Sequence, residues 1–487
     1  MEEVSFGTDG WRGVIADDYT YENLGRVARA LADYLKSPER EELRVYEEWG
    51  TPYRSHDEGV IIGYDGRFAS EDFALFVARV LIDSGVPASV TERMVPTPAL
   101  AFSVKERSAA TGVMITASHN PPEYNGFKVK LESGASAPPE VTDAIEGRLP
   151  EDFKEVDPNI SVNRVDASSD YVEALTEIVD EERMTRNPVL AVIDSMYGSA
   201  AGFTARVLDE FGVPHVGVRQ EYNPSFKGVR PEPLEENLEP LRAEILEQKA
   251  MNDVPVMGVV TDGDGDRISS MAQDGSFIDA HRTYALLMKY LVETRGWEGK
   301  AVKNFPLTDM IFKIGEKHGI DVEETAVGFK FIAEKMVRED VLIGGEESGG
   351  IGLKNHIPDR DGVLCALLLL EMVADAGKPP SELVDELLAE YGGHYYRRND
   401  IHLEGRKEVA EMVEKDPPDE IAGHEVKSVE TTDGIKLRFS DGWLLIRASG
   451  TEPLLRLYCE MDDETKLDEI LTEAEKYSRD LVGEPKK

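Results

Sequence analysis

The chain has 487 residues, which is more than one compact core usually holds, so we expect roughly three or four domains. It carries 95 acidic against 54 basic side chains, for a formal net charge of -41. Such a surface repels nucleic acids and acidic lipid headgroups, and no basic stripe offsets the repulsion, which excludes both as expected partners. A carboxylate excess of this size is typical of proteins that stay dispersed in concentrated salt, so we expect a halophilic source.

The two cysteines, Cys365 and Cys459, lie among apolar neighbours, which favours core positions over a disulfide or a thiolate metal site. The first residues contain no charged-then-apolar leader. The longest apolar run, residues 363–370, is too short to span a bilayer. We therefore expect a soluble, cytoplasmic protein.

From residue 59 onwards the chain repeats one pattern, in which a short apolar strand leads into a polar or glycine-containing loop. An amphipathic helix is expected at 71–84. Strands buried on both faces that alternate with helices indicate α/β layers, whose ligands gather at the carboxyl ends of the strands. In chain order, the expected strands cover residues 60–63, 113–115, 189–193, 254–260 and 341–343.

The C-terminal part changes character, with strands expected at 435–439, up to Arg447 and at 454–458, then a helix at 462–481. This order predicts a separate α+β domain. The acidic, aromatic segment 37–59 has no periodicity and is interpreted as a surface insertion. Turn-rich stretches divide the chain into four predicted domains, at 1–156, 157–272, 273–390 and 391–487.

The sharpest local motif runs from Thr116 to Pro122 with the sequence TASHNPP, and Asn125-Gly126-Phe127-Lys128 follows it. Ser118 stands at a strand end among turn-forming residues, where a hydroxyl is exposed for reaction. His119 and Lys128 are candidates for moving protons or balancing phosphate charge. Taken alone, an ordinary polar turn is the better interpretation of so short a motif.

A second motif, Asp262-Gly263-Asp264-Gly265-Asp266-Arg267, directly follows an apolar strand. Carboxylates at alternate positions, with glycines between them, can converge on one hard cation. An EF-hand is disfavoured because its sixth position would be Arg267 instead of glycine. A solvated acidic turn is also disfavoured, since packed carboxylates repel one another without a cation.

Two further loops offer groups that bind sugars and phosphates. Glu346 and Ser348 lie in GGEESGG, where a helix-capping loop is an equal alternative. The string RASGTEP provides Arg447, Ser449, Gly450 and Thr451, where an ordinary turn is an equal alternative. The chain has no Walker A loop, no G-x-S-x-G elbow and no H-E-x-x-H helix, which disfavours the common ATPases, hydrolases and zinc proteases.

Together, in this order and spacing, the motifs resemble the α-D-phosphohexomutase family, which includes phosphoglucomutase and phosphomannomutase. The resemblance starts at FGTDGWRG, residues 6–13, and ends at the Arg447 loop. It implies three similar α/β domains with mixed sheets and a C-terminal α+β domain around a central cleft. In chain order these would be a phosphoserine, a metal-binding, a sugar-recognition and a phosphate-binding domain.

The resemblance also implies a role for each motif residue. Ser118 would carry the phosphoryl group, and Asp262, Asp264 and Asp266 would hold Mg²⁺ together with Ser118 and its phosphate. Arg12, His119 and Lys128 would act beside Ser118. Substrate contacts would come from a larger set, comprising Arg267, Lys330, Glu346, Ser348, Arg447, Ser449, Gly450 and Thr451.

The implied reaction interconverts hexose 1-phosphate and hexose 6-phosphate through a hexose 1,6-bisphosphate, which also serves as activator. Some family members have histidine where this chain has Gly350. We therefore assign the roles of general acid and general base to Lys128 and His119. The motifs favour glucose or mannose and leave the choice between them open. A phosphoglucosamine mutase, a metal-dependent sugar phosphatase and a non-catalytic sugar-phosphate sensor remain alternatives. The expected partners are small sugar phosphates, with the chain acting as a monomer or a homodimer.

Overall fold

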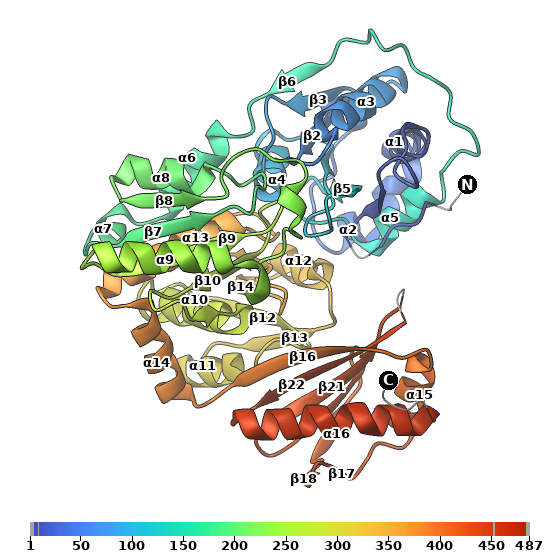
Figure 1. Cartoon of the computed structure of the whole chain (residues 1–487). Helices are drawn as coiled ribbons and strands as arrows, with labels where there is room; N and C mark the ends of the chain where they lie inside the picture. Colours follow the sequence, from blue (N-terminus) through green and yellow to red (C-terminus); the bar gives the residue numbers. More distant parts are fainter. Residues whose placement is uncertain (1–3, 8, 451–452, 484–487) are drawn as a thin grey trace. The chain divides into compact units, whose positions relative to one another are not determined.

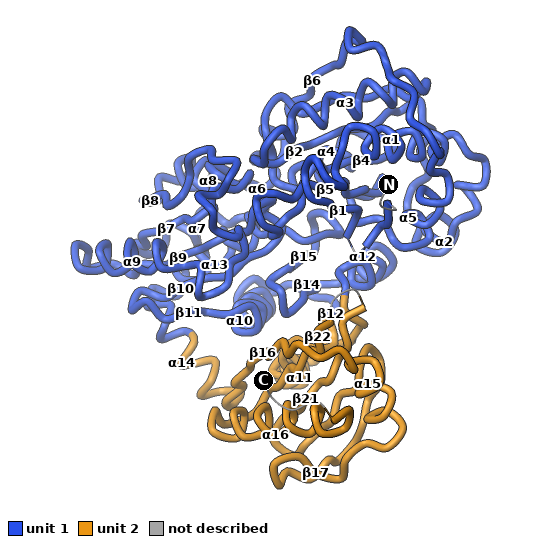
Figure 2. The backbone as a smooth tube through the Cα atoms, turned by 45° about the vertical axis from the view of Figure 1, so that its right-hand side comes forward, with its two compact units in different colours: residues 1–302, 328–383 blue, residues 303–327, 384–487 orange. Residues whose placement is uncertain are grey.

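The computed structural model describes residues 4–7, 9–450 and 453–483. The chain separates into two compact units, which Figure 2 shows in different colours. Unit 1 comprises Met1–Val302 and Gly328–Leu383, and unit 2 comprises Lys303–Val327 and Val384–Lys487. Each unit therefore combines segments that are distant in the sequence.

Unit 1 contains a six-stranded mixed sheet with the order β1-β5-β4-β2-β3-β6, of which Figure 1 labels β2, β3, β5 and β6. Strands β4, β2, β3 and β6 are parallel neighbours, whereas β5 runs antiparallel to β4 and β1. Strand β2 is buried along its whole length, which accounts for its apolar sequence VIIGY. The strand and helix expected at 60–63 and 71–84 are confirmed as β2 and α3. The elements are β1 (Trp11–Val14), α1 (Tyr21–Leu35), β2 (Val60–Tyr64), α3 (Ser70–Asp83), β3 (Ala88–Thr91), α4 (Thr97–Glu106), β4 (Thr111–Ile115), β5 (Tyr124–Lys130), α5 (Pro139–Glu146) and β6 (Asn163–Val165).

The segment 37–59 lies mostly at the surface, as the sequence predicts, but part of it is buried. It forms η1 (Pro38–Glu42), α2 (Arg44–Glu47) and η2 (His56–Glu58), and Arg40, Val45 and Trp49 are buried. The Arg40 guanidinium pairs with the buried Glu132 and lies over the ring of Tyr53. Because aromatic rings and a buried carboxylate surround this cation, Arg40 is buried although the stretch around it is acidic and without periodicity.

The second sheet of unit 1 is also mixed, with the order β11-β10-β9-β7-β8. Strands β9, β7 and β8 are parallel, and β10 folds back antiparallel to β9. The turn between β9 and β10 contains the aspartate motif, so this reversal brings the motif to the carboxyl end of β9. The elements are α6 (Ser169–Ile178), α7 (Glu181–Met184), β7 (Leu190–Asp194), α8 (Phe203–Phe211), β8 (His215–Val218), η3 (Phe226–Gly228), η4 (Glu235–Asn237), α9 (Glu239–Met251), β9 (Val256–Thr261), β10 (Ile268–Met271), β11 (Phe277–Ile278) and α10 (Ala280–Glu293).

The late segment of unit 1 supplies α12 (Phe329–Arg338), β14 (Val341–Gly345), β15 (Ile351–Leu353) and α13 (Gly362–Ala376). The longest apolar run lies in α13, which packs against α7, α8, α10 and β9. A helix that is apolar on all sides is a core helix, and Cys365 is buried in it as expected. The side chain of Asp361 accepts a hydrogen bond from the Leu364 backbone and caps its start.

Unit 2 contains an antiparallel sheet with the order β16-β22-β21-β20-β19 and the small pair β17-β18. Its core gathers residues of this sheet with residues of α15 and α16, and it includes the buried Cys459. The helix expected at 462–481 is confirmed as α16. The elements are β16 (Tyr395–His402), α15 (Arg406–Lys415), β17 (Glu420–Ile421), β18 (His424–Glu425), β19 (Ser428–Glu430), β20 (Ile435–Arg438), β21 (Gly442–Ala448), β22 (Leu454–Met461) and α16 (Glu464–Val482).

Four elements lie at or beyond the points where the chain passes between the units: β12 (Lys300–Asn304), α11 (Met310–His318), β13 (Val322–Thr325) and α14 (Pro380–Tyr391). Of the helices in the described part of the chain, none has both the length and the apolar character that crossing a bilayer requires.

Candidate active site

Ser118 stands at the centre of the predicted site, in the loop that follows β4. Its side chain is 1% exposed, and its backbone has a φ of 52°, a left-handed conformation that is uncommon for serine. The hydroxyl Oγ donates to Asp262 Oδ2 at 2.8 Å and lies 3.3 Å from His119 Nδ1. Ser118 therefore contacts the aspartate motif and a histidine at once.

Asp262, Asp264 and Asp266 converge as the sequence predicts. Each offers a carboxylate oxygen, and these oxygens lie within 4.8 Å of one another. All three side chains are fully buried. Burial, together with the charges of the other two aspartates, raises the pKa of Asp262 well above its ordinary range. Burial acts to raise the pKa of Asp264, but the charge and hydrogen bond of Lys128, with further help from Thr97 and Arg360, together outweigh burial and hold that pKa below its ordinary value.

The carboxylates leave oxygens for a cation. Asp264 Oδ1 and Asp266 Oδ1 are buried, and within the described residues neither has a hydrogen-bond partner. Unpaired buried carboxylate oxygens cost free energy unless a charge compensates them. Oxygen ligands of this kind suit a hard divalent cation such as Mg²⁺, so the residues fit the metal that the sequence predicts.

Cationic side chains surround the same carboxylates. Lys128 Nζ lies 2.8 Å from Asp264, 3.1 Å from Asp266 and 2.8 Å from Asp9. These three carboxylates outweigh burial and raise the Lys128 pKa far above its ordinary value, which keeps the ammonium charged. Arg12 donates to Asn120 at 2.5 Å, in the Ser118 loop.

Cations lie around His119, whereas carboxylates lie around Lys128. Burial and the neighbouring cations, Arg267 first among them, lower the pKa of His119 well below the ordinary value, so the imidazole is neutral at neutral pH. Arg267 in turn contacts Glu232 at 3.2 Å, and Glu232 lies 4.0 Å from His119 Nε2. A neutral imidazole beside a hydroxyl can accept its proton.

Arg360 joins the aspartate motif to the predicted sugar loop, and the sequence did not single it out. Its guanidinium donates to Asp266 at 2.6 Å and Asp9 at 2.7 Å, and it contacts Glu346 at 3.5 Å. Burial raises the pKa of Glu346 to about 7, and the charge of Arg360 opposes that rise. Glu346 also accepts from the backbone of Gly328 at 3.1 Å.

The other predicted residues of this loop are less enclosed. Ser348 is half-buried in the turn after β14, and Lys330 lies in the first turn of α12. Burial lowers the pKa of Lys330 from its ordinary value.

The predicted phosphate loop lies in unit 2, at the end of β21. Arg447 Nε donates to Asp433 at 2.8 Å, and the backbone carbonyl of Ser449 accepts from Arg406 at 3.0 Å. Gly450 follows in a bend. Thr451 lies outside the described residues.

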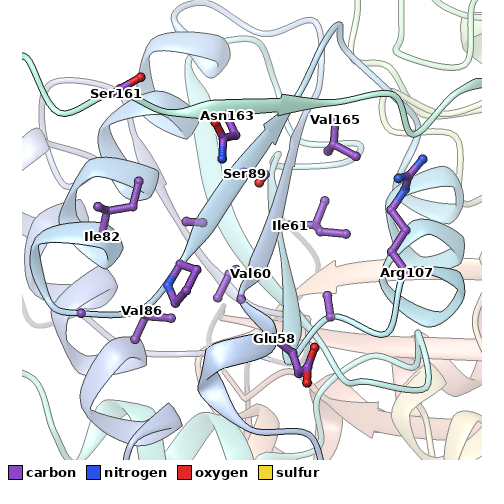
Figure 3. A pocket seen from close by; sticks show the side chains of 15 residues that line it. Glu58, Val60, Ile61, Ile82, Val86, Ser89, Arg107, Ser161, Asn163 and Val165 are labelled. Atoms are coloured by element: carbon purple, nitrogen blue, oxygen red, sulfur yellow. The ribbon is translucent and has the colours of Figure 1, made fainter.

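A cavity of about 530 Å³ lies elsewhere in unit 1, beside β2, β3 and β6. Figure 3 shows its lining, which includes Glu58, Ile61, Arg107 and Val165. None of the predicted site residues lines it.

Four family models match successive parts of the chain. Those of the α/β/α domains I, II and III of phosphoglucomutase/phosphomannomutase match residues 3–155, 169–275 and 279–391, and that of the C-terminal domain matches residues 408–476. The chain belongs to the phosphoglucomutase/phosphomannomutase family. The predicted fold class, with mixed sheets in α/β domains and a distinct C-terminal domain, is thereby confirmed.

Relatives match the chain over nearly its whole length. A Thermococcus kodakarensis phosphoglucomutase/phosphomannomutase is 31% identical over 96% of both chains. A Sulfurisphaera tokodaii phosphoglucosamine/phosphogalactosamine mutase is 28% identical over 97% of this chain and 98% of that protein. A solved structure from Thermus thermophilus, assigned as a phosphomannomutase, matches with a TM-score of 0.84 and 34% identity over 98% of this chain and 99% of that one.

Sequence reasoning missed three side chains of this site. Asp9 belongs to the quoted N-terminal motif, but nothing in the motif indicates that it pairs with Lys128. Arg360 and Glu232 lie in polar loops without a recognisable pattern, and only the fold brings them beside Asp266 and His119.

Proposed function

We propose that this chain interconverts hexose 1-phosphate and hexose 6-phosphate, with glucose or mannose as the sugar, through a phosphoserine at Ser118 and a hexose 1,6-bisphosphate. One observation carries the proposal: a buried serine hydroxyl lies 2.8 Å from the first of three converging aspartates. A nucleophile beside a cation site is the arrangement that phosphoryl transfer requires.

In the proposed cycle, the bond between phosphorus and Ser118 Oγ breaks as a bond to the sugar 6-hydroxyl forms. The hydroxyl proton goes to a base and from it to the departing Ser118 Oγ; His119 is suited to this transfer, because it is neutral and its Nδ1 lies 3.3 Å from Ser118 Oγ. The resulting bisphosphate turns around, Ser118 Oγ attacks the phosphorus of the 1-phosphate, and the bond from that phosphorus to the sugar O1 breaks. The serine proton passes to the sugar O1, leaving hexose 6-phosphate.

The remaining side chains bind and neutralise charge. Lys128 stays protonated among its carboxylates, so its proposed role is electrostatic, which leaves His119 as the better candidate for the base. Arg12 and Arg267 would offer donors to the transferring phosphoryl group. When Mg²⁺ is bound by Asp262, Asp264 and Asp266, it supplies charge neutralisation for the phosphoryl oxygens.

Sugar recognition is proposed for Glu346, Ser348 and Lys330, and binding of the non-reacting phosphate for the loop of Arg447, Ser449, Gly450 and Thr451. A hexose 1,6-bisphosphate is proposed as activator. In support, a variant N-acetylphosphoglucosamine mutase from Aspergillus fumigatus, which shares the fold at a TM-score of 0.54 and 15% identity, has been solved in complex with glucose 1,6-bisphosphate. We also propose four domains at 1–156, 157–272, 273–390 and 391–487, a monomer or homodimer, a cytoplasmic location and a halophilic source.

The second candidate is a phosphoglucosamine mutase, because a Methanopyrus kandleri relative with 30% identity over 96% of this chain bears that name. The two functions share the Ser118 chemistry and differ at the sugar 2-position. They predict different substrates and the same effect of removing Ser118.

The test compares isomerisation of glucose 1-phosphate, mannose 1-phosphate and glucosamine 1-phosphate, with Mg²⁺ and a trace of the matching bisphosphate. Ser118→Ala should abolish every activity. Ser103→Ala is the matched control, since the Ser103 hydroxyl is buried and has no hydrogen-bond partner among the described residues. Equal rates in wild type and Ser118→Ala, or release of free phosphate in place of isomerisation, would refute the proposal.

A further inference from the structure

The loop after β2 has the sequence Asp65-Gly66-Arg67, and the proposed chemistry does not use it. The Arg67 side chain is nevertheless buried in unit 1, at 1% exposure. A buried guanidinium has five N–H groups to satisfy. Its Nε donates to Asp65 at 3.0 Å, and its cationic carbon lies 5.0 Å from the centre of the Phe226 ring.

The other donors of Arg67 all reach backbone carbonyls of the Ser118 loop. Nη2 donates to the carbonyl of Ser118 at 2.6 Å and of Asn120 at 2.7 Å. Nη1 donates to the carbonyl of Pro121 at 2.7 Å and of Tyr124 at 3.0 Å. One planar side chain therefore fixes the whole loop between β4 and β5.

The backbone N–H of Ser118 is also linked to the Asp65–Arg67 loop, through Thr116. This N–H donates to the Thr116 hydroxyl at 2.9 Å, and that hydroxyl donates to Asp65 at 2.6 Å. Asp65 also accepts from the Arg67 backbone at 3.0 Å. The N–H and the carbonyl of Ser118 are thus both tied, directly or through Thr116, to the Asp65–Arg67 ion pair.

We propose that Arg67 is a positioning residue for phosphoryl transfer, which holds Ser118 in its left-handed conformation and thereby directs Oγ toward Asp262. The inference rests on the proposed function and deepens it. A serine with a φ of 52° requires such a restraint, because this conformation is unfavourable for a residue with a side chain. Lysine cannot replace arginine here, since an ammonium has three donors on one atom and no planar fork.

We call Arg67, together with Asp65 and Thr116, the clamp of the Ser118 loop. This clamp would determine whether the phosphoryl group goes to a sugar hydroxyl or to water. In transfer, the sugar hydroxyl oxygen attacks phosphorus and the bond to Ser118 Oγ breaks. In hydrolysis, a water oxygen attacks the same phosphorus, and inorganic phosphate and the free serine hydroxyl are released. A loop without its clamp misplaces phosphorus relative to a bound sugar, whereas mobile water still reaches it.

The experiment uses the full chain phosphorylated with glucose 1,6-bisphosphate, and compares wild type with Arg67→Lys. A displacement of about 1 Å at the reacting atom costs about a hundredfold in rate, so kcat for glucose 1-phosphate should fall by about that factor, with KM unchanged. Because water still reaches phosphorus while transfer to the sugar slows, phosphate released per sugar isomerised should rise by up to about the same factor.

Arg40→Lys is the matched control, because Arg40 is also buried in unit 1 and also donates to backbone carbonyls, those of Arg54 and Ala110. It should lose stability without changing the ratio of phosphate released to sugar isomerised. Thr116→Val is the second variant, which removes the hydroxyl link and leaves Arg67 in place. It should raise the same ratio even if Arg67→Lys fails to fold.

The possible outcomes distinguish a failure of the proposed role of Arg67 from a failure of the proposed phosphoserine cycle. Suppose that wild type is phosphorylated at Ser118 and isomerises the sugar, but Arg67→Lys and Thr116→Val release the same amount of phosphate per sugar isomerised as Arg40→Lys. The role of the clamp is then refuted, and the proposed function stands. If wild type never carries phosphate at Ser118, the proposed function fails and the role of Arg67 fails with it.

Discussion

Replacing Lys128 with methionine should destabilise unit 1 and change its response to Mg²⁺. The Lys128 ammonium is 1% exposed and lies 2.8 Å from Asp9, 2.8 Å from Asp264 and 3.1 Å from Asp266. Methionine keeps most of the length of the side chain as an unbranched apolar chain, but leaves these carboxylates without their shared cation. Breaking a buried ion pair costs about 3–5 kcal/mol, and we expect a loss of that size in the free energy of unfolding measured in urea with excess EDTA.

Added Mg²⁺ should restore part of this loss, because a divalent cation compensates the same carboxylates. Its stabilising effect should therefore be larger in Lys128→Met than in wild type, and calorimetry should record tighter Mg²⁺ binding. Lys130→Met is the matched control on the same strand, since Lys130 is equally buried but pairs with Asp359. It should lose stability with no change in the Mg²⁺ response. An unchanged unfolding free energy in Lys128→Met, or an equal response to Mg²⁺ in both variants, would refute the reasoning.

Three further predictions concern pH and salt. Burial raises the pKa of Glu346 to about 7, so kcat/KM for hexose 1-phosphate should fall as pH drops below about 7, and Glu346→Gln should lack this inflection. Since the folded carboxyl binds the extra proton, the free energy of unfolding in urea should fall as pH rises from 4.5 to about 7, a slope absent from the variant. Burial lowers the pKa of Lys436 from 10.5 to about 7. The unfolded lysine therefore binds the extra proton, the free energy of unfolding should rise with pH across that window, and Lys436→Met should flatten the rise. The net charge of -41 predicts a thermal midpoint that increases with KCl concentration, and a midpoint that falls or stays level would contradict the screening argument.

The strands of the α/β domains could be predicted because burial on both faces leaves an unbroken apolar run. Strands β2 and β9 show this. The burial of Arg40 in the segment 37–59 could not be predicted, since it depends on Glu132, which lies far along the chain and pairs with Arg40. A charged residue gives no local sign that a distant partner will bury it.

The candidate site likewise contains residues that the sequence could predict and residues that only the fold brings together. Asp262, Asp264 and Asp266 are neighbours in the sequence, so their convergence follows from one turn after one strand. The partners of Lys128 and Ser118 come from separate loops, and their pairing depends on how the two sheets of unit 1 pack. The roles of Asp9, Arg360 and Glu232 therefore emerged only from the structure.

The most direct test of the account is to follow the phosphoryl group itself. The protein would be incubated with glucose 1,6-bisphosphate, the modified residue located by tandem mass spectrometry, and unlabelled glucose 1-phosphate then added while the protein-bound phosphate and the sugar products are measured. The account predicts phosphate on Ser118 and its transfer to the sugar within a single turnover. Isomerisation that proceeds with no phosphate on Ser118, or with phosphate on another residue, would contradict it.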